Sequence, residues 1–236
     1  MALSGKPSAS ATNEDKVVKI FLDTADVDRL QLYGNDRRVH GITTNPALMK
    51  KAGIGSYRNF ATIVLGIANG RPVSLEVTAD DLDEMERQAR ELASWGENVY
   101  VKLPVTNTRG ESTIPLIEKL QEFKLNITAV MTGAQIEALR PVLCGHHILS
   151  VFAGRIADTG RDPVHIMRKA RLCHAQVLWA SAREVLNVYQ AEECGCDIIT
   201  LTPDLIGKLD LHGKSLTDYS LETVKQFHED GKGIKL

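Results

Sequence analysis

The stretch "VSLEVTADDLDEMERQARELASWGENVYVKL" (Val73–Leu103) decides the fold. Its two ends are short runs rich in β-branched residues, which favour strands. The segment between them has apolar residues near the helical period and stops at Gly96, as an amphipathic helix does. Two neighbouring strands joined by a helical crossover pair in parallel. This stretch therefore predicts a strand–helix–strand unit of a parallel sheet.

The same unit recurs along the chain, and eight strand-like runs alternate with helical segments. Eight such units in about 200–250 residues are typical of a (β/α)8 TIM barrel, and the chain has 236 residues. We predict one barrel domain over residues 17–236, preceded by a disordered polar arm over residues 1–16. The alternative, an open doubly wound sheet, would require fewer strands or a GxGxxG phosphate motif, which the sequence lacks. The strand-like runs are 17–23, 41–45, 73–77, 99–103, 125–130, 148–152, 177–181 and 197–202.

Composition and charge narrow the class of protein. Hydrophobic residues make up 43% and charged residues 25% of the chain, and the formal net charge is −2. This balance provides no general attraction for nucleic acid or for an anionic membrane. Residues 1–16 lack the apolar core of a secretory signal, and the four cysteines are not spaced like a zinc knuckle. We expect reduced thiols, a cytoplasmic location, no cofactor and no metal, since no His/Cys/Asp cluster is evident at metal-ligand spacing.

Polar residues gather at the carboxyl end of nearly every predicted strand. In a barrel these ends form the mouth in which catalytic groups sit. Side chains alternate between the two faces of a strand, and the outward positions here are apolar. The polar residues should therefore point into the mouth, where a purely structural barrel would have Val, Ile or Leu. The residues are Asp23, Asn45, Glu76, Lys102, Thr128, Ser150 with Phe152, Ser181, and Thr200 or Thr202; Asn126 shares the face of Thr128.

Lys102 lies inside an apolar run and has two possible explanations. A lysine at a strand end can extend its amine to solvent. Alternatively, a lysine between two carboxylates in a closed mouth can form a Schiff base with a carbonyl substrate. The amine must then be neutral to attack, and the carbinolamine must lose water. Glu76 with Thr128 fits the proton transfers of that step, and Asp23 fits the acid–base role in breaking a carbon–carbon bond.

A phosphate site is predicted after the sixth and seventh strands. "SVFAGR" places Arg155 there, and "ASAR" places Ser181 and Arg183. Arginine suits multidentate phosphate recognition, and barrels commonly bind phosphate with their late loops. We expect Ser181 to lead into the helix that runs through Val185 to Tyr189, whose N-terminus can add backbone N–H donors. For either arginine alone, a surface role remains the alternative.

Seven motifs in order, with a C-terminal helical segment over residues 216–232, resemble the transaldolase family. The resemblance implies a (β/α)8 barrel with a C-terminal helix, metal-free Schiff-base chemistry at Lys102, and acid–base roles for Asp23 and for Glu76 with Thr128. It implies hydroxyl contacts from Asn45, Asn126 and Ser150, and phosphate contacts from Arg155, Ser181 and Arg183. It also implies phosphorylated sugars as substrates, a place in pentose phosphate-type carbohydrate metabolism, and a homo-oligomer. The motifs are "FLDTADVD", "GITTNPALMKKAG", "LEVTADD", "VYVKLPVT", "LNITAVMTGAQ", "SVFAGRIADTG" and "LWASAREVLNVYQAEECGCDIITLTPDLIGKL".

The resemblance also separates two activities. True transaldolases transfer a dihydroxyacetone unit, whereas related aldolases release it and typically carry Gln at position 76 and Tyr at position 152. Glu76 and Phe152 are the transaldolase choices. Met131, Thr132 and Trp179 depart from the family pattern and leave the acceptor sugar open, with an unusual aldose phosphate as one alternative. An aldolase and a binding barrel without catalysis remain the rival hypotheses.

Overall fold

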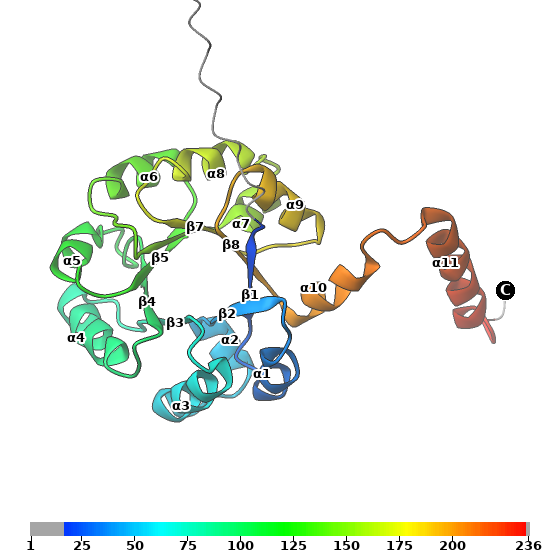
Figure 1. The fold of residues 1–236 in the computed structure, drawn as a ribbon, viewed down its shortest axis with the longest axis horizontal. Helices are drawn as coiled ribbons and strands as arrows, with labels where there is room; N and C mark the ends of the chain where they lie inside the picture. Colours follow the sequence, from blue (N-terminus) through cyan, green and yellow to red (C-terminus); the bar gives the residue numbers. More distant parts are fainter. Residues whose placement is uncertain (1–16, 235–236) are drawn as a thin grey trace, which may run out of the picture.

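Eight parallel strands form a closed barrel in a computed structural model that describes residues 17–234 (Figure 1). Each strand pairs with the next, and β8 pairs with β1 to close the ring. The predicted TIM barrel is therefore confirmed, and the proposed arm over residues 1–16 lies outside the described residues. The strands are β1 (Lys19–Asp23), β2 (Val39–Thr43), β3 (Val73–Glu76), β4 (Val99–Pro104), β5 (Leu125–Val130), β6 (Ile148–Val151), β7 (Gln176–Trp179) and β8 (Ile198–Leu201).

Helices surround the barrel in the order that the sequence predicts (Figure 1). Several β–α units contain a second short helix, as after β2 and after β6. The helices are α1 (Val27–Gly34), α2 (Pro46–Lys51), α3 (Tyr57–Ala68), α4 (Leu82–Ala93), α5 (Ile114–Lys119), α6 (Gly133–Leu139), α7 (Ala153–Asp158), α8 (Val164–Ala170), α9 (Leu186–Glu193), α10 (Pro203–Lys208), the 3-10 helix η1 (Leu209–Leu211) and α11 (Leu216–Asp230).

Two layers of apolar side chains hold the barrel together. The outward residues of the strands, such as Val101 and Ile127, are fully buried beneath the helices. A second, smaller cluster contains Phe21 and Leu178 of β1 and β7, with Tyr100 and Phe152 packed against it. The strands are thus apolar towards the helices, as the alternation predicts. This arrangement leaves the polar strand ends as one surface at the carboxyl end of the barrel.

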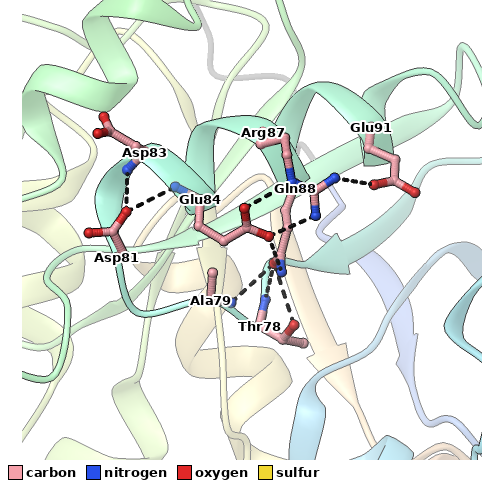
Figure 2. Close-up of polar contacts among 8 residues, drawn as sticks. All are labelled: Thr78, Ala79, Asp81, Asp83, Glu84, Arg87, Gln88 and Glu91. Atoms are coloured by element: carbon pink, nitrogen blue, oxygen red, sulfur yellow. Dashed lines mark hydrogen bonds and ion pairs between the residues drawn. The ribbon is translucent and has the colours of Figure 1, made fainter.

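Polar contacts fix α4 to the loop that follows β3, next to the barrel mouth (Figure 2). The Asp81 carboxylate accepts hydrogen bonds from the backbone N–H groups of Asp83 and Glu84 and caps the helix. One turn further on, Oε1 of Gln88 accepts from the backbone N–H groups of Thr78 and Ala79. These contacts satisfy backbone donors at the end of the strand that carries Glu76, so they stabilise the position of that strand end.

The last helix differs from all the others. It extends away from the barrel (Figure 1), and none of the residues of α11 is buried. Leu216, Val224 and Phe227 are 83%, 61% and 69% exposed. Across residues 17–234, no helix is long and apolar enough to cross a membrane.

Candidate active site

A cavity of about 440 Å³ opens at the carboxyl ends of the strands. Ten of the eleven predicted site residues line it, and the structure therefore brings together side chains that lie up to 158 positions apart in the chain, from Asp23 to Ser181. The ten are Asp23, Asn45, Glu76, Lys102, Asn126, Thr128, Ser150, Phe152, Arg155 and Ser181.

Lys102 points from β4 into this cavity and is held by two partners. Its ammonium nitrogen lies 2.9 Å from Oε2 of Glu76 and donates a 2.8 Å hydrogen bond to the carbonyl oxygen of Thr44. The Lys102 side chain is only 7% exposed. The amine therefore does not extend to bulk solvent, and this excludes the surface-lysine explanation. Strand pairing sets the contact, because Glu76 lies opposite Lys102 in the β3–β4 register.

Asp23 lies on the other side of the cavity, at the end of β1. The hydroxyl of Thr43 donates a 2.8 Å hydrogen bond to Oδ1 of Asp23, and a second contact of 2.5 Å links the hydroxyls of Thr43 and Thr200. Burial raises the pKa of the Asp23 carboxyl above its ordinary value, while the positive charge of Lys102 and the hydrogen bond from Thr43 partly oppose that rise. A carboxyl with a raised pKa is suited to accepting and returning a proton.

Thr128 lies at the end of β5 with its hydroxyl unpaired. Oγ1 is buried and has no hydrogen-bond partner among the described residues. The next residue, Ala129, has the positive φ of 60°, and the β5–β6 pairing shifts register between Ile127 and Val130. A left-handed residue that is not glycine is strained, and such strain concentrates at functional sites. The irregular backbone leaves the Thr128 hydroxyl free to bind a group that enters the cavity.

A chain of hydrogen bonds crosses the floor of the cavity. Ser150 donates to Oδ1 of Asn126 at 2.6 Å, and Nδ2 of Asn126 donates to the hydroxyl of Ser74 at 3.0 Å. These three side chains come from β6, β5 and β3 and are buried. Their partners fix the orientation of the Asn126 amide. At the rim of the cavity, the side chain of Asn45 is fixed by a backbone contact: its Oδ1 accepts a hydrogen bond from the N–H of Leu48 and caps α2.

The first residues of α7 approach the segment after β7 closely at Gly154. A Cβ atom on this residue would lie 1.6 Å from the carbonyl oxygen of Ser181, so only glycine fits. Ser181 itself has a φ of 63°. This contact brings Arg155, in the first turn of α7, to the same rim of the cavity as Ser181. The guanidinium of Arg155 lies 5.7 Å from the centre of the Phe152 ring.

Arg183 is the predicted residue that the structure does not bring to the cavity. Its guanidinium is half exposed and forms an ion pair with Asp158, with Nε 3.1 Å from Oδ1. The helix α9 begins at Leu186, five residues after Ser181. The predicted helix is therefore present from Leu186 on, and the backbone between it and Ser181 is held by Asn187, whose Oδ1 accepts from the N–H groups of Arg183 and Glu184.

The three residues that depart from the transaldolase pattern lie in different parts of the structure. Met131 lines the cavity, whereas Trp179 is buried in the packed layer between strands and helices and is not among the lining residues. Thr132 caps α6 by accepting a hydrogen bond from Gln135. Of the three unusual residues, Met131 alone lines the cavity.

Thr43 is a residue of the cavity that was not predicted from the sequence. Its hydroxyl holds Asp23, and it lines the cavity. The signal was present in "GITTN", because positions 41, 43 and 45 share one face of an alternating strand. Of the residues on that face, only Asn45 was predicted to belong to the site.

A group of three possible metal ligands lies outside the cavity. Among the described residues, Cys144, His146 and His147 offer ligand atoms that all lie within 4.8 Å of one another. This proximity corrects the expectation that the chain has no such cluster. None of the three lines the cavity.

Comparison with known proteins agrees with this geometry. The family model described as "Transaldolase/Fructose-6-phosphate aldolase" matches residues 20–235. A "Probable transaldolase" of Methanococcus maripaludis is 35% identical over 87% of this chain and 94% of its own length. A "Probable transaldolase" of Dehalococcoides mccartyi is 31% identical over 92% of this chain and its full length.

Solved structures show a likeness in fold. The tryptophan synthase α-subunit of Pyrococcus furiosus superposes with a TM-score of 0.59 at 14% identity, covering 87% of this chain and 94% of that one. Dihydrodipicolinate synthase from Rhodopseudomonas palustris gives a TM-score of 0.55 at 15% identity, covering 84% of this chain and 75% of that one.

Proposed function

Because the chain belongs to the transaldolase/fructose-6-phosphate aldolase family, we propose that it transfers a dihydroxyacetone unit from a ketose phosphate to an aldose phosphate through a Schiff base on Lys102. The observation that carries the proposal is the buried amine of Lys102, which lies 2.9 Å from the Glu76 carboxylate inside a cavity of sugar size. Ketose phosphates such as fructose 6-phosphate and sedoheptulose 7-phosphate are the proposed donors.

Glu76 supports the first half of the reaction. By taking a proton from the Lys102 ammonium, its carboxylate leaves a neutral amine that can attack the ketose carbonyl carbon. The carbinolamine then loses water, which requires a proton donor close to the departing hydroxyl. The unpaired hydroxyl of Thr128 lines the same cavity and can position that water together with Glu76.

Asp23 supports the carbon–carbon bond cleavage. The imine nitrogen accepts the electron pair of the breaking bond, while Asp23 removes the proton of the sugar hydroxyl whose carbon becomes the leaving aldehyde. Its raised pKa favours retention of that proton. When an acceptor aldehyde arrives, the enamine attacks it, and Asp23 returns the proton to the new alkoxide. The chemistry uses the chain's own amine and requires no cofactor.

The rim formed by Arg155 and Ser181 is the proposed phosphate site. A guanidinium and a hydroxyl on one rim suit a phosphate dianion. The network of Ser150 and Asn126 lies between this rim and Lys102 in the sheet order, and it offers polar groups to the sugar hydroxyls.

Borohydride trapping tests the proposal. Incubation with fructose 6-phosphate and borohydride should add a reduced substrate fragment to Lys102, which mass spectrometry of peptides can locate. Lys102→Ala should abolish both trapping and turnover. Lys50→Ala is the matched control, since Lys50 is exposed on α2. If Lys102→Ala retains a tenth of the wild-type activity, the Schiff-base assignment is wrong.

The alternative activity is aldol cleavage with release of free dihydroxyacetone. Glu76 and Phe152 are the residues that the family resemblance associates with transfer, and the Phe152 ring adds no hydroxyl that could protonate the enamine. We expect Phe152→Tyr, with or without Glu76→Gln, to raise the ratio of free dihydroxyacetone to transferred product at a fixed acceptor concentration. A wild-type protein that already releases mostly dihydroxyacetone would support the aldolase instead.

A further inference from the structure

The loop between α6 and β6 gathers one thiol and two imidazoles at the amino end of the strands, opposite the candidate active site. Cys144 and His146 lie in the loop, and His147 is the residue before β6. His147 is fully buried, Cys144 is half-buried, and His146 is exposed. The proposed reaction uses none of these side chains, so their grouping requires a separate explanation.

The distances match those in a tetrahedral metal site. Sγ of Cys144 lies 3.6 Å from Nδ1 of His146 and 3.3 Å from Nε2 of His147. Zinc–sulfur and zinc–nitrogen bonds of about 2.3 and 2.0 Å at a tetrahedral angle place S and N about 3.5 Å apart. Because Sγ is almost equidistant from both nitrogens of each ring, the imidazoles must rotate for one nitrogen of each to face a shared ion.

Each ring also has backbone hydrogen-bond partners, and the backbone N–H of Cys144 donates to Nδ1 of His147 at 3.4 Å, a contact that an ion at that nitrogen would replace. Nε2 of His146 lies 2.9 Å from the carbonyl oxygen of Gln121, and the ring of His147 is hydrogen-bonded to the backbone of Phe123. Metal-binding histidines usually donate their second ring N–H to such an acceptor, which orients the ring and sets the tautomer. With Nε2 of His146 donating, its Nδ1 is the nitrogen left for an ion.

We propose that Cys144, His146 and His147 bind a zinc ion. One thiolate and two imidazoles form a donor set that suits Zn²⁺ and excludes Mg²⁺ and Ca²⁺, which prefer oxygen. Binding converts the Cys144 thiol into a thiolate, and its proton leaves to the solvent. The fourth tetrahedral position is taken by water, since three protein ligands are present.

The bound ion would link two loops at the base of the barrel. The α6–β6 loop supplies the ligands, while Gln121 and Phe123 precede β5 and hold the rings. An ion that binds the folded chain and not the unfolded chain raises stability in proportion to its occupancy. The site lies at the opposite end of the strands from Lys102, so we expect it to change stability and not turnover.

Cobalt titration of the metal-free, reduced full-length chain tests this site. We expect one Co²⁺ to bind with the near-ultraviolet charge-transfer band of a cobalt–thiolate bond, and Zn²⁺ to displace it. Cys144→Ser should remove the band, and the exposed His146→Ala should weaken binding by more than about tenfold, because even outer-shell partners contribute that much. Zn²⁺ should raise the melting temperature of the wild type and leave that of Cys144→Ser unchanged. Matched controls are Cys194→Ala and His165→Ala, which should bind as the wild type does.

Two outcomes would overturn the proposal. One is the absence of a cobalt–thiolate band in the folded wild type. The other is a cobalt–thiolate band that persists in Cys144→Ser, or an affinity that is unchanged in His146→Ala, whose side chain is exposed and whose substitution should leave the fold intact. Turnover measured with and without EDTA should be equal, which separates this site from the Schiff-base proposal.

Discussion

The buried carboxyl of Asp23 makes the free energy of unfolding depend on pH. Its pKa is raised in the folded chain above the ordinary value of 3.8, mainly by burial. Between the ordinary pKa and the raised pKa, the folded state binds more protons than the unfolded state. The free energy of unfolding therefore falls as the pH rises through that window. Above the raised pKa, a buried charge remains that costs stability.

We therefore expect Asp23→Asn to abolish transfer but to increase the free energy of unfolding. The increase should be larger at pH 8 than at pH 4. The amide oxygen can still accept the hydrogen bond from Thr43. Urea unfolding at several pH values measures the difference. Asp28→Asn is the control, because it removes an exposed carboxylate from the first turn of α1, where negative charge is favourable, and should lose stability at high pH. Equal effects of the two variants would contradict the prediction.

Arg155 and Arg183 should differ although the sequence presents them as equivalents. Arg155→Ala removes the guanidinium from the rim of the cavity. We expect KM for phosphorylated sugars to rise roughly ten- to a hundredfold, as loss of one charged hydrogen bond costs about 1.5–3 kcal/mol.

Arg183→Ala breaks only a half-exposed ion pair with Asp158, and KM should change less than about threefold. Steady-state kinetics with phosphorylated and unphosphorylated donors separates the two variants. Equal effects of Arg155→Ala on both donor classes would show that this arginine is structural.

At the scale of the element, the contact between α7 and the end of β7 shapes the phosphate rim. Gly154→Ala would place a methyl group 1.6 Å from the carbonyl oxygen of Ser181, so the backbone must move. We expect a loss of about 1–3 kcal/mol in the free energy of unfolding and a raised KM for phosphorylated donors.

Gly66→Ala is the matched control for that substitution. Gly66 lies within α3 with open space around it, and alanine should stabilise the helix by about 0.5–1 kcal/mol. Denaturant unfolding of both variants gives the comparison. A Gly154→Ala protein as stable as the wild type would show that the two loops do not constrain each other.

In the whole molecule the last helix stands out, since none of the residues of α11 is buried by the described part of the chain. A helix of 15 residues is marginal in water unless its apolar face is packed, and Leu216, Val224 and Phe227 share one face. The barrel surface also exposes apolar side chains, including Leu172 and Leu186. We propose that a second copy of the chain covers α11, because each copy then supplies both a helix and a receiving surface, as a symmetric homo-oligomer requires.

Phe227→Asp should lower the mass of the particle in light scattering and leave the barrel folded. Lys225→Glu on the opposite face of α11 is the control and should leave the mass unchanged. A monomeric wild type, or an oligomer that tolerates Phe227→Asp, would contradict the proposal.

The alternation of strands and helices in the sequence was enough to predict the barrel and most of the residues that line the cavity. Strand bounds agree within two residues, because β-branched runs and helical periods are local signals. Ten of the eleven predicted residues line the cavity because parallel strands all end on one edge, so the place of a residue at a strand end predicts its place in the fold.

Three properties of the protein depend on contacts between residues far apart in the chain and could not be predicted from the sequence. Whether Arg183 faces the cavity depends on the carboxylate of Asp158, 25 positions away. Whether Cys144, His146 and His147 meet depends on how one loop turns against the backbone of another. The pKa of Asp23 depends on burial, which exists only after the barrel closes. These properties arise from side-chain direction and solvent exclusion, which no local pattern encodes.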